Sequence, residues 1–185
     1  RLSGMMLDYP KLLDKGIGGL RSDLLEKLKE QPDNNFYKAG IQCLDIFVDC
    51  ASHLQQDARE QMASADEKRQ KELERICQAL ENIKEKKPGT FHEAMQLFWL
   101  FALLAGVINY GRLDDYLGPY LVADLESGRL TDEEAYRYIH SLWTMIENRR
   151  TTVNGRIIVG GKGRKHPKEA DVFLHIAMKV AKNCR

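Results

Sequence analysis

Cysteine and histidine are the residues of this chain whose types most directly suggest catalysis or metal binding. The four cysteines (Cys43, Cys50, Cys77 and Cys184) show no C-x-x-C spacing and have no histidine at the intervals typical of metal ligands. The sequence HEAMQ, which starts at His92, lacks the second histidine of a zinc-binding H-E-x-x-H helix. We therefore predict no metal site in these residues, and free thiols in a reducing, cytoplasmic compartment.

A second candidate for chemistry is the basic, glycine-rich segment GGKGRKHPK at 160–168. It invites comparison with phosphate-binding loops, but it lacks the G-x-x-x-x-G-K-[ST] pattern whose backbone amides cradle phosphates. We predict a solvated loop here, with a contact to another protein as the alternative. The chain of 185 residues carries a net charge of only +1, so no general attraction to nucleic acid or to an acidic membrane is expected.

The elements that must position these residues are predicted to be mainly helical. Gly16 is expected to separate a short helix from the next one, and capping boxes at Thr90 and Thr131 mark two further helix starts. The dipeptide Asn154-Gly155, between β-branched residues, predicts either a tight hairpin or a turn before a buried strand. A long helix is expected to carry its apolar stripe at Phe36, Cys43, Phe47, Cys50 and Leu54.

The most apolar part of the chain is the uninterrupted run from Leu97 to Ile108. The uncharged stretch around it, from Ala94 to Gly111, touches the lower limit of about 18 residues for a membrane span. Polar Gln96 and Asn109 interrupt that stretch, and no lysine or arginine cluster flanks it, which disfavours a membrane span. We predict a helix that is apolar on all sides and therefore surrounded by protein. Because a few amphipathic helices supply little cover, we expect this chain to be a piece of a longer protein, or to be covered by another subunit.

The segment INYGRLDDYLGPY at 108–120, which follows the apolar run, belongs to a longer ordered set of motifs. These include TFHEAMQ at 90–96, GRLTDEEA at 128–135 and IIVGGKGR at 157–164. In this order and spacing they resemble the N-terminal half of glycyl radical enzymes, the pyruvate formate-lyase-like family. The resemblance covers nearly the whole chain, so residues 1–185 are expected to be part of a single domain of that type.

The resemblance implies a fold and a chemistry. This portion would be mainly α, with one short hairpin or strand near 151–161, and would form the helical wall and first strand of a larger α/β barrel of ten strands. The full-length protein would be a cytoplasmic enzyme of anaerobic metabolism, with a small-molecule substrate and a homodimeric assembly. An activating enzyme that uses S-adenosylmethionine and an iron–sulfur cluster would install a glycyl radical, and a cysteine thiyl radical would then cleave a C–C, C–O or C–N bond, in a formate acetyltransferase or dehydratase type of reaction.

The radical carriers of the family are not expected among these residues. The family's thiyl cysteine lies in a C-x-E loop, and no cysteine of this chain has a glutamate two residues later. Its radical glycine lies in an R-V-x-G-[YF] loop, which RIIVGG at 156–161 does not match. The resemblance therefore implies no catalytic residue here.

By position, the resemblance brings forward Thr152, Asn154 and Arg156 as substrate-binding residues, because the strand before the paired glycines lines the pocket in relatives. A surface hairpin at this point is the alternative. An inward-pointing Arg156 would favour a substrate that carries a carboxylate.

Arg112 is predicted to form a structural ion pair with Asp114 or Asp115, since a bidentate, charge-assisted contact would permit these charges to be buried. A different class of function also remains open at this point: a self-contained helical protein-interaction module without catalysis.

Overall fold

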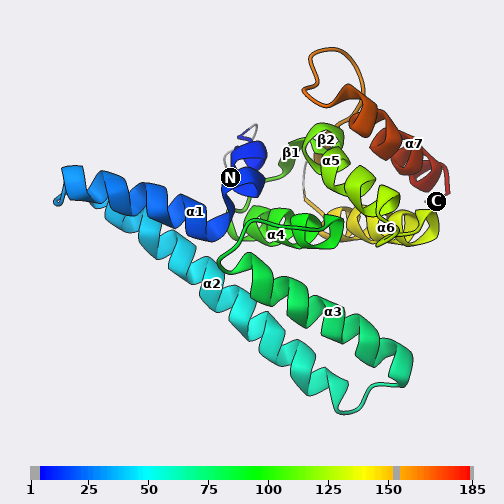
Figure 1. The fold of residues 1–185 in the computed structure, drawn as a ribbon, viewed down its shortest axis with the longest axis horizontal. Coiled ribbons are helices and arrows are strands. Elements are labelled where there is room, and N and C mark those ends of the chain that lie inside the picture. Colours follow the sequence, from blue (N-terminus) through cyan, green and yellow to red (C-terminus); the bar gives the residue numbers. More distant parts are fainter. Residues whose placement is uncertain (1–4, 152–154, 184–185) are drawn as a thin grey trace. The chain divides into compact units, whose positions relative to one another are not determined.

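The computed structural model describes residues 5–151 and 155–183 and consists mainly of α-helices (Figure 1). In chain order the elements are α1 (Tyr9–Glu30), α2 (Asn35–Met62), α3 (Glu67–Ile83), α4 (Phe91–Leu104), β1 (Asn109–Arg112), α5 (Leu113–Glu126), α6 (Asp132–Asn148), β2 (Arg156–Ile158) and α7 (Pro167–Asn183). The chain divides into two compact units, which are described separately. Among the described residues, no helix is both long and apolar enough to cross a membrane.

One unit comprises Pro10–Pro88 and Gln96–Leu104, and its first feature is a break in α1 at Gly16. The backbone there has φ of 65° and ψ of 178°, and an added Cβ would lie 2.7 Å from the carbonyl oxygen of Lys86. Just beyond the break, the N–H of Gly18 donates to the carbonyl of Glu85 at 2.9 Å. The predicted separation at Gly16 is confirmed, and glycine is needed because the backbones approach so closely.

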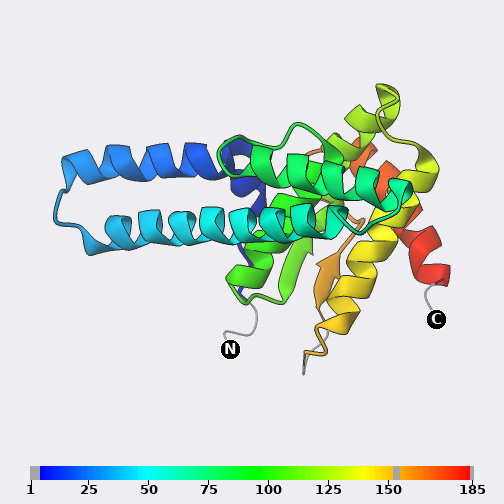
Figure 2. The ribbon, with the colours of Figure 1, turned by 90° about the horizontal axis from the view of Figure 1, so that it is seen from below.

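The helices α2 and α3 of this unit lie side by side in opposite directions (Figure 2). Gln55 and Cys77 join them, because the side-chain amide of Gln55 donates to the carbonyl of Cys77 at 2.8 Å. The thiol of Cys77 in turn contacts the carbonyl of Gln55 at 3.6 Å. These contacts satisfy polar groups that the packing of the two helices removes from water.

The predicted apolar stripe of α2 is only partly buried. Phe47 is 1% exposed, but Phe36 is 76% exposed and Leu54 is 42% exposed. The prediction is wrong for the last two and for Cys43, which is also exposed. At Leu54 it is wrong because the face toward α3 includes the neighbouring polar Gln55, which hydrophobic periodicity does not place inside. The buried residues of α2 are Leu44, Phe47, Ala51, Gln55 and Ala58.

The apolar run does not form one continuous helix. The helix α4 ends at Leu104, Gly106 has φ of 66°, and β1 begins at Asn109. Phe98 is fully buried, whereas Leu103 and Leu104 are 39% and 46% exposed. The predicted all-round burial is therefore wrong for the second half of the run, since a glycine with positive φ follows the helix end and the next apolar residues lead into a strand.

The other unit comprises Arg1–Tyr9, Gly89–Met95 and Ala105–Arg185, and it contains a two-stranded sheet. The strands β1 and β2 pair in parallel, with Asn109 opposite Arg156 and Arg112 opposite Ile158. The mainly α fold with a short strand near 151–161 is thus confirmed. The hairpin alternative is wrong for β2, because its partner strand lies before α5 and α6 in the chain.

Gly155 is required by packing at the start of β2. An added Cβ would lie 2.7 Å from the ring of Tyr110 and 2.7 Å from a methyl group of Ile146. A larger residue would push β2 away from these side chains, so the glycine serves a close approach. The predicted turn at 154–155 reaches outside the described residues. Asn154 lies outside the described residues.

The capping box of α6 is confirmed. The Thr131 hydroxyl accepts from the N–H of Glu134 at 3.2 Å, and the Glu134 carboxylate accepts from the N–H of Thr131 at 3.1 Å. At α4, Thr90 caps the N–H of Glu93 at 3.2 Å. The Glu93 carboxylate, however, accepts from the N–H of Gly89 at 2.7 Å, one residue before the predicted position.

The helix α7 packs against both α5 and α6 (Figure 1). The approach to α5 is closest at Gly118, where an added Cβ would lie 2.8 Å from the carbonyl carbon of Glu169. Because that neighbour is backbone, it has little freedom to move aside. Gly118 therefore sets the spacing between α5 and α7.

We expect Gly118→Ala to destabilise the protein by about 1–3 kcal/mol, because the new methyl group would force α5 and α7 apart. Thermal denaturation followed by circular dichroism measures this change. Ala123→Leu, which adds more bulk on the exposed side of the same helix, is the matched control and should leave the midpoint nearly unchanged. Equal midpoints for Gly118→Ala and the wild type would contradict the proposed spacing role.

Candidate functional site

The carboxyl ends of β1 and β2 are the natural place to look for a site, because parallel sheets present ligand-binding groups at that edge. The strand β1 ends at Arg112 and runs directly into α5, and β2 ends at Ile158 and runs into a glycine-rich loop. That loop extends from Gly160 to His166, just before α7. Arg112 and the first turn of α5 contact this loop through four hydrogen bonds.

Arg112 binds the loop through its guanidinium group. Its Nη1 donates to the carbonyl of Gly160 at 3.0 Å, and its Nη2 donates to the carbonyl of Lys162 at 3.0 Å. No ion pair joins Arg112 to Asp114 or Asp115 in the described part of the chain. The predicted pairing is therefore wrong, because the guanidinium bridges two loop carbonyls instead.

Both aspartates also bind backbone groups of the loop. The N–H of Gly160 donates to Oδ2 of Asp114 at 2.6 Å, and the N–H of His166 donates to Oδ1 of Asp115 at 2.9 Å. Asp114 is fully buried, which makes its acceptor role costly to lose. We refer to Arg112, Asp114 and Asp115, with their bonds to the loop, as the clamp.

Arg164 closes the loop from its far side. Its Nε donates to the carbonyl of Gly161 at 3.0 Å, and its Nη1 lies 2.6 Å from a carboxylate oxygen of Asp171. The same nitrogen lies 3.9 Å from Oδ2 of Asp114, so one cation offsets part of that buried charge. The loop is thus held by side chains from α5, from α7 and from its own sequence.

A cluster of three tyrosines, Tyr9, Tyr110 and Tyr116, lies at β1. The hydroxyl of Tyr116 donates to the carbonyl of Tyr110 at 2.7 Å, and its ring stacks on Tyr9 with centroids 5.3 Å apart. Arg149, at the end of α6, donates to the hydroxyl of Tyr110 at 2.8 Å and to the carbonyl of Val107 at 2.7 Å. Burial, followed by the nearby Tyr9 and Asp114, raises the pKa of Tyr116 well above its usual value.

Several residues of this arrangement had no signal in the sequence. Arg164 and Asp171 are unremarkable charged residues of a basic loop and a helix, and nothing marks Tyr116 as the partner of the Tyr110 carbonyl. The glycines were the available signal, because Gly111, with φ of 62°, faces Met6 so closely that a side chain is excluded. A glycine inside an aromatic and charged motif indicates such a close approach.

Arg156 is the predicted substrate-binding residue that the structure describes. It is exposed on β2, opposite Asn109 of β1. Its backbone N–H donates to the carbonyl of Ile108 at 2.9 Å, and within the described residues no hydrogen bond or ion pair of its guanidinium is present. Thr152 and Asn154 lie outside the described residues.

The described residues do not bring metal ligands together. Among them, no group of three or more histidine, cysteine, aspartate and glutamate side chains is placed to hold a metal ion. Cys43 is exposed, Cys50 is half-buried and Cys77 is buried. The cysteines that the structure describes are therefore free thiols, two on α2 and one on α3, and Cys184 lies outside the described residues.

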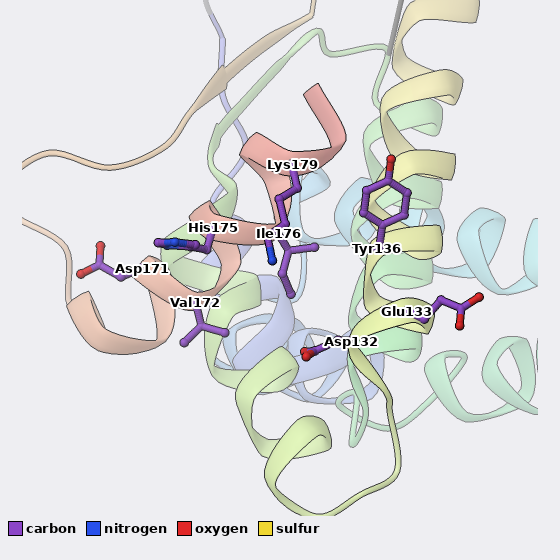
Figure 3. Close-up of a pocket in the computed structure, with 8 residues that line it drawn as sticks. All are labelled: Asp132, Glu133, Tyr136, Asp171, Val172, His175, Ile176 and Lys179. Carbon is purple, nitrogen blue, oxygen red and sulfur yellow. The ribbon is translucent and has the colours of Figure 1, made fainter. Parts of the chain in front are cut away.

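A groove between α6 and α7 is a second candidate (Figure 3). It has a volume of about 580 Å³, and carboxylates of Asp132, Glu133 and Asp171 stand at its rim. In the described part of the chain, none of its lining side chains hydrogen-bonds another, so it lacks the paired groups that acid–base catalysis requires. Its lining residues are Asp132, Glu133, Tyr136, Asp171, Val172, His175, Ile176 and Lys179.

Comparison with known proteins identifies a family that this chain resembles in sequence. The sequence model of a family described as pyruvate formate lyase-like matches residues 2–185. An isethionate sulfite-lyase of Nitratidesulfovibrio vulgaris is 27% identical over 153 residues, which are 74% of this chain and 18% of that protein. A probable dehydratase of Escherichia coli is 30% identical over 162 residues, 77% of this chain and 20% of that protein. The chain spans about a fifth of the length of these relatives.

Solved structures show the same fold. A glycyl radical enzyme from Archaeoglobus fulgidus superimposes with a TM-score of 0.79 at 21% identity, over 95% of this chain and 27% of that one. The glycerol-bound form of the B12-independent glycerol dehydratase from Clostridium butyricum gives a TM-score of 0.76 at 23% identity, over 95% and 26% of the two chains. The observed arrangement of helices and strands is therefore the one found in about a quarter of each of these larger proteins.

We expect Arg112→Lys to loosen the loop, because a lysine ammonium cannot bridge two carbonyls as the planar guanidinium does. Losing one charge-assisted bond should increase the free energy of the clamped state by about 1.5–3 kcal/mol. Hydrogen–deuterium exchange of the peptide covering 159–166 measures the effect, and the amide of Gly160 should exchange faster. Arg137→Lys, on an exposed position of α6, is the control. Unchanged exchange in Arg112→Lys would contradict the clamp.

The raised pKa of Tyr116 predicts a loss of stability at alkaline pH. An unfolded tyrosine releases its proton near pH 10, whereas the buried one keeps it, so the unfolded state binds fewer protons and gains in relative stability as pH rises above about 10. Below that pH this contribution is constant. Urea denaturation at several pH values should show a shallower alkaline decline for Tyr116→Phe than for the wild type. Identical declines would show that Tyr116 does not carry the effect.

Proposed function

The chain belongs to the pyruvate formate lyase-like family, and on this premise we propose that it is part of a glycyl radical enzyme that cleaves its substrate through a thiyl radical. The observation that carries the proposal is the match of the family over residues 2–185. The parallel strand pair, followed by a clamped glycine loop, supports it because this is the edge at which such folds bind ligands.

The reaction type that the relatives favour is elimination. They include isethionate sulfite-lyases, a trans-4-hydroxy-L-proline dehydratase of Clostridioides difficile and a (2S)-3-sulfopropanediol dehydratase of Klebsiella oxytoca. We therefore favour a lyase or dehydratase over an acetyltransferase for the whole protein. In such an enzyme the thiyl radical abstracts a hydrogen atom from the substrate, and the leaving group is then lost from the neighbouring carbon with its electron pair and a proton. The product radical takes a hydrogen atom back from the cysteine thiol, which regenerates the thiyl radical.

In this proposal the described residues form part of the helical wall and a strand of the barrel, and they do not carry the radicals. No cysteine of the chain precedes a glutamate by two positions, and Cys77 packs between α2 and α3 against Gln55. We place the thiyl cysteine and the radical glycine in other parts of the protein. The role of this portion is then to exclude water from the reacting groups, which protects a radical and strengthens polar contacts with substrate.

We propose that Arg156, together with Thr152 and Asn154, faces the substrate. Arg156 carries a guanidinium that no described side chain neutralises, on a strand whose carboxyl end leads into the clamped loop. A carboxylate or sulfonate of the substrate would accept two parallel hydrogen bonds from it. The clamp would fix the position of β2 along β1, and it would thereby fix the position of the Arg156 guanidinium.

The partners follow from the same proposal. A separate activating enzyme, which uses S-adenosylmethionine and an iron–sulfur cluster, would install the radical in a cytoplasmic homodimer. We assign the cluster to the activating enzyme because the family resemblance implies this division of labour.

The proposal is tested on the full-length natural protein under anaerobic conditions. After treatment with its cognate activating enzyme and S-adenosylmethionine, we expect an organic radical in the electron paramagnetic resonance spectrum. We also expect turnover of at least one compound among isethionate, trans-4-hydroxy-L-proline, (2S)-3-sulfopropanediol and glycerol. A protein that yields no radical after activation would overturn the radical assignment.

For an anionic substrate of the active enzyme, Arg156→Gln should raise KM by about tenfold or more and leave kcat within a few-fold, since a hydrogen bond to a charged group contributes about 1.5–3 kcal/mol. Arg156→Lys should restore part of the loss because it retains the charge. Arg137→Gln, exposed on α6, is the matched control. An unchanged KM for Arg156→Gln would remove this residue from the substrate site.

A further inference from the structure

We propose that the loop Gly160–His166, together with Lys168 in the first turn of α7, is a docking surface for an acidic segment of a partner protein. This inference concerns the outer side of the loop and is independent of the reaction proposed above. It rests on the charge of the loop, on the direction of its backbone amides and on the rigidity that the clamp gives it.

The charge of the loop is unusual for this chain. Residues 160–168 include no aspartate or glutamate, although the whole chain has a net charge of only +1. Arg164 is engaged by Asp171 and lies near Asp114. Lys162, Lys165 and Lys168 are all exposed, and none forms an ion pair with a described residue. Three positive charges therefore remain available within one short segment.

The backbone adds further donors on the same loop. The carbonyls of Gly160, Gly161 and Lys162 are occupied by the guanidinium groups of Arg112 and Arg164. In a trans peptide the N–H of the next residue points opposite to the carbonyl, and the described chain has no cis peptide bond. The N–H groups of Gly161 and Gly163 are therefore directed away from Arg112, and the N–H of Lys162 is directed away from Arg164. All three residues are exposed.

These amides are not consumed by other bonds. Within the described residues, no hydrogen bond is donated by the backbone N–H of Gly161, Lys162 or Gly163. Positive φ values of 73°, 80° and 83° at Gly160, Gly161 and Gly163 maintain the conformation. The loop therefore keeps exposed N–H donors, each of which can donate to a carboxylate oxygen.

The loop is also held in one conformation before any partner arrives. Arg112 binds two of its carbonyls, Asp114 and Asp115 bind the amides at its two ends, and Arg164 binds a third carbonyl. A surface ordered in advance loses less conformational entropy on binding. The contacts of the clamp and of Arg164 therefore lower the entropic cost of binding a partner at the exposed side of the loop.

An acidic protein segment fits this surface better than a single small anion does. Exposed charges in water contribute little one at a time. The three lysines are spaced at 162 and 165 on the loop and at 168 in the first turn of α7. A segment with several carboxylates would engage all three lysines together, so that each contact after the first is effectively intramolecular. We therefore commit to an acidic segment as the occupant.

The test uses the full-length natural protein and a fluorescent hexaglutamate peptide as the probe. We expect binding that weakens steeply between about 50 and 200 mM salt, because exposed ion pairs are screened. The variant Lys162→Gln, Lys165→Gln and Lys168→Gln should raise the Kd by about tenfold, in keeping with three exposed ion pairs. Its thermal midpoint should match the wild type, since these side chains hold no described contact.

The matched control changes the same net charge elsewhere, with Lys29→Gln, Lys68→Gln and Lys179→Gln at exposed positions. It should retain the wild-type Kd. Equal weakening in both variants, or no binding of the peptide, would overturn the proposal. Displacement of the peptide by inorganic phosphate at an equal concentration of charge would overturn it in favour of a small-anion site.

Discussion

The buried carboxylate of Asp114 is the constraint on which the rest of the sheet region depends. It is fully removed from solvent, and its firmest contact is the N–H of Gly160 at 2.6 Å. A buried charge is tolerated only where donors and cations compensate it, and here these are the Gly160 amide and Arg164 at 3.9 Å. The loop therefore has to return to the first turn of α5, which in turn fixes where β2 can pair with β1.

Local chemistry in the sequence was enough to predict part of this fold. The break at Gly16 and the capping box at Thr131 depend on residues close together in the chain, and both are present in the structure. The clamp was not predictable in the same way, because Arg112 and its acceptor Gly160 are 48 residues apart. An arginine followed by two aspartates favours a local ion pair on charge alone, and only the fold shows that backbone groups of the loop bind all three. Oδ1 of Asp114 is buried and has no hydrogen-bond partner among the described residues.

The strand direction shows the same limit of local reasoning. Asn154-Gly155 has the composition of a hairpin turn, yet β2 pairs in parallel with a strand that lies two helices earlier. The glycine is explained by Tyr110 and Ile146, which leave no room for a Cβ. Because these contacts come from β1 and α6, a window of ten residues contains no information about them.

Arg112 and Arg156 illustrate why residue type alone does not assign a role at this site. They lie on neighbouring parallel strands, Arg112 at the end of β1 and Arg156 at the start of β2. The guanidinium of Arg112 is engaged by two loop carbonyls, so binding a substrate there would break the contacts that hold the loop. Arg156 is exposed and has no competing acceptor among the described residues. Of the two, only Arg156 can bind an anion without a structural cost.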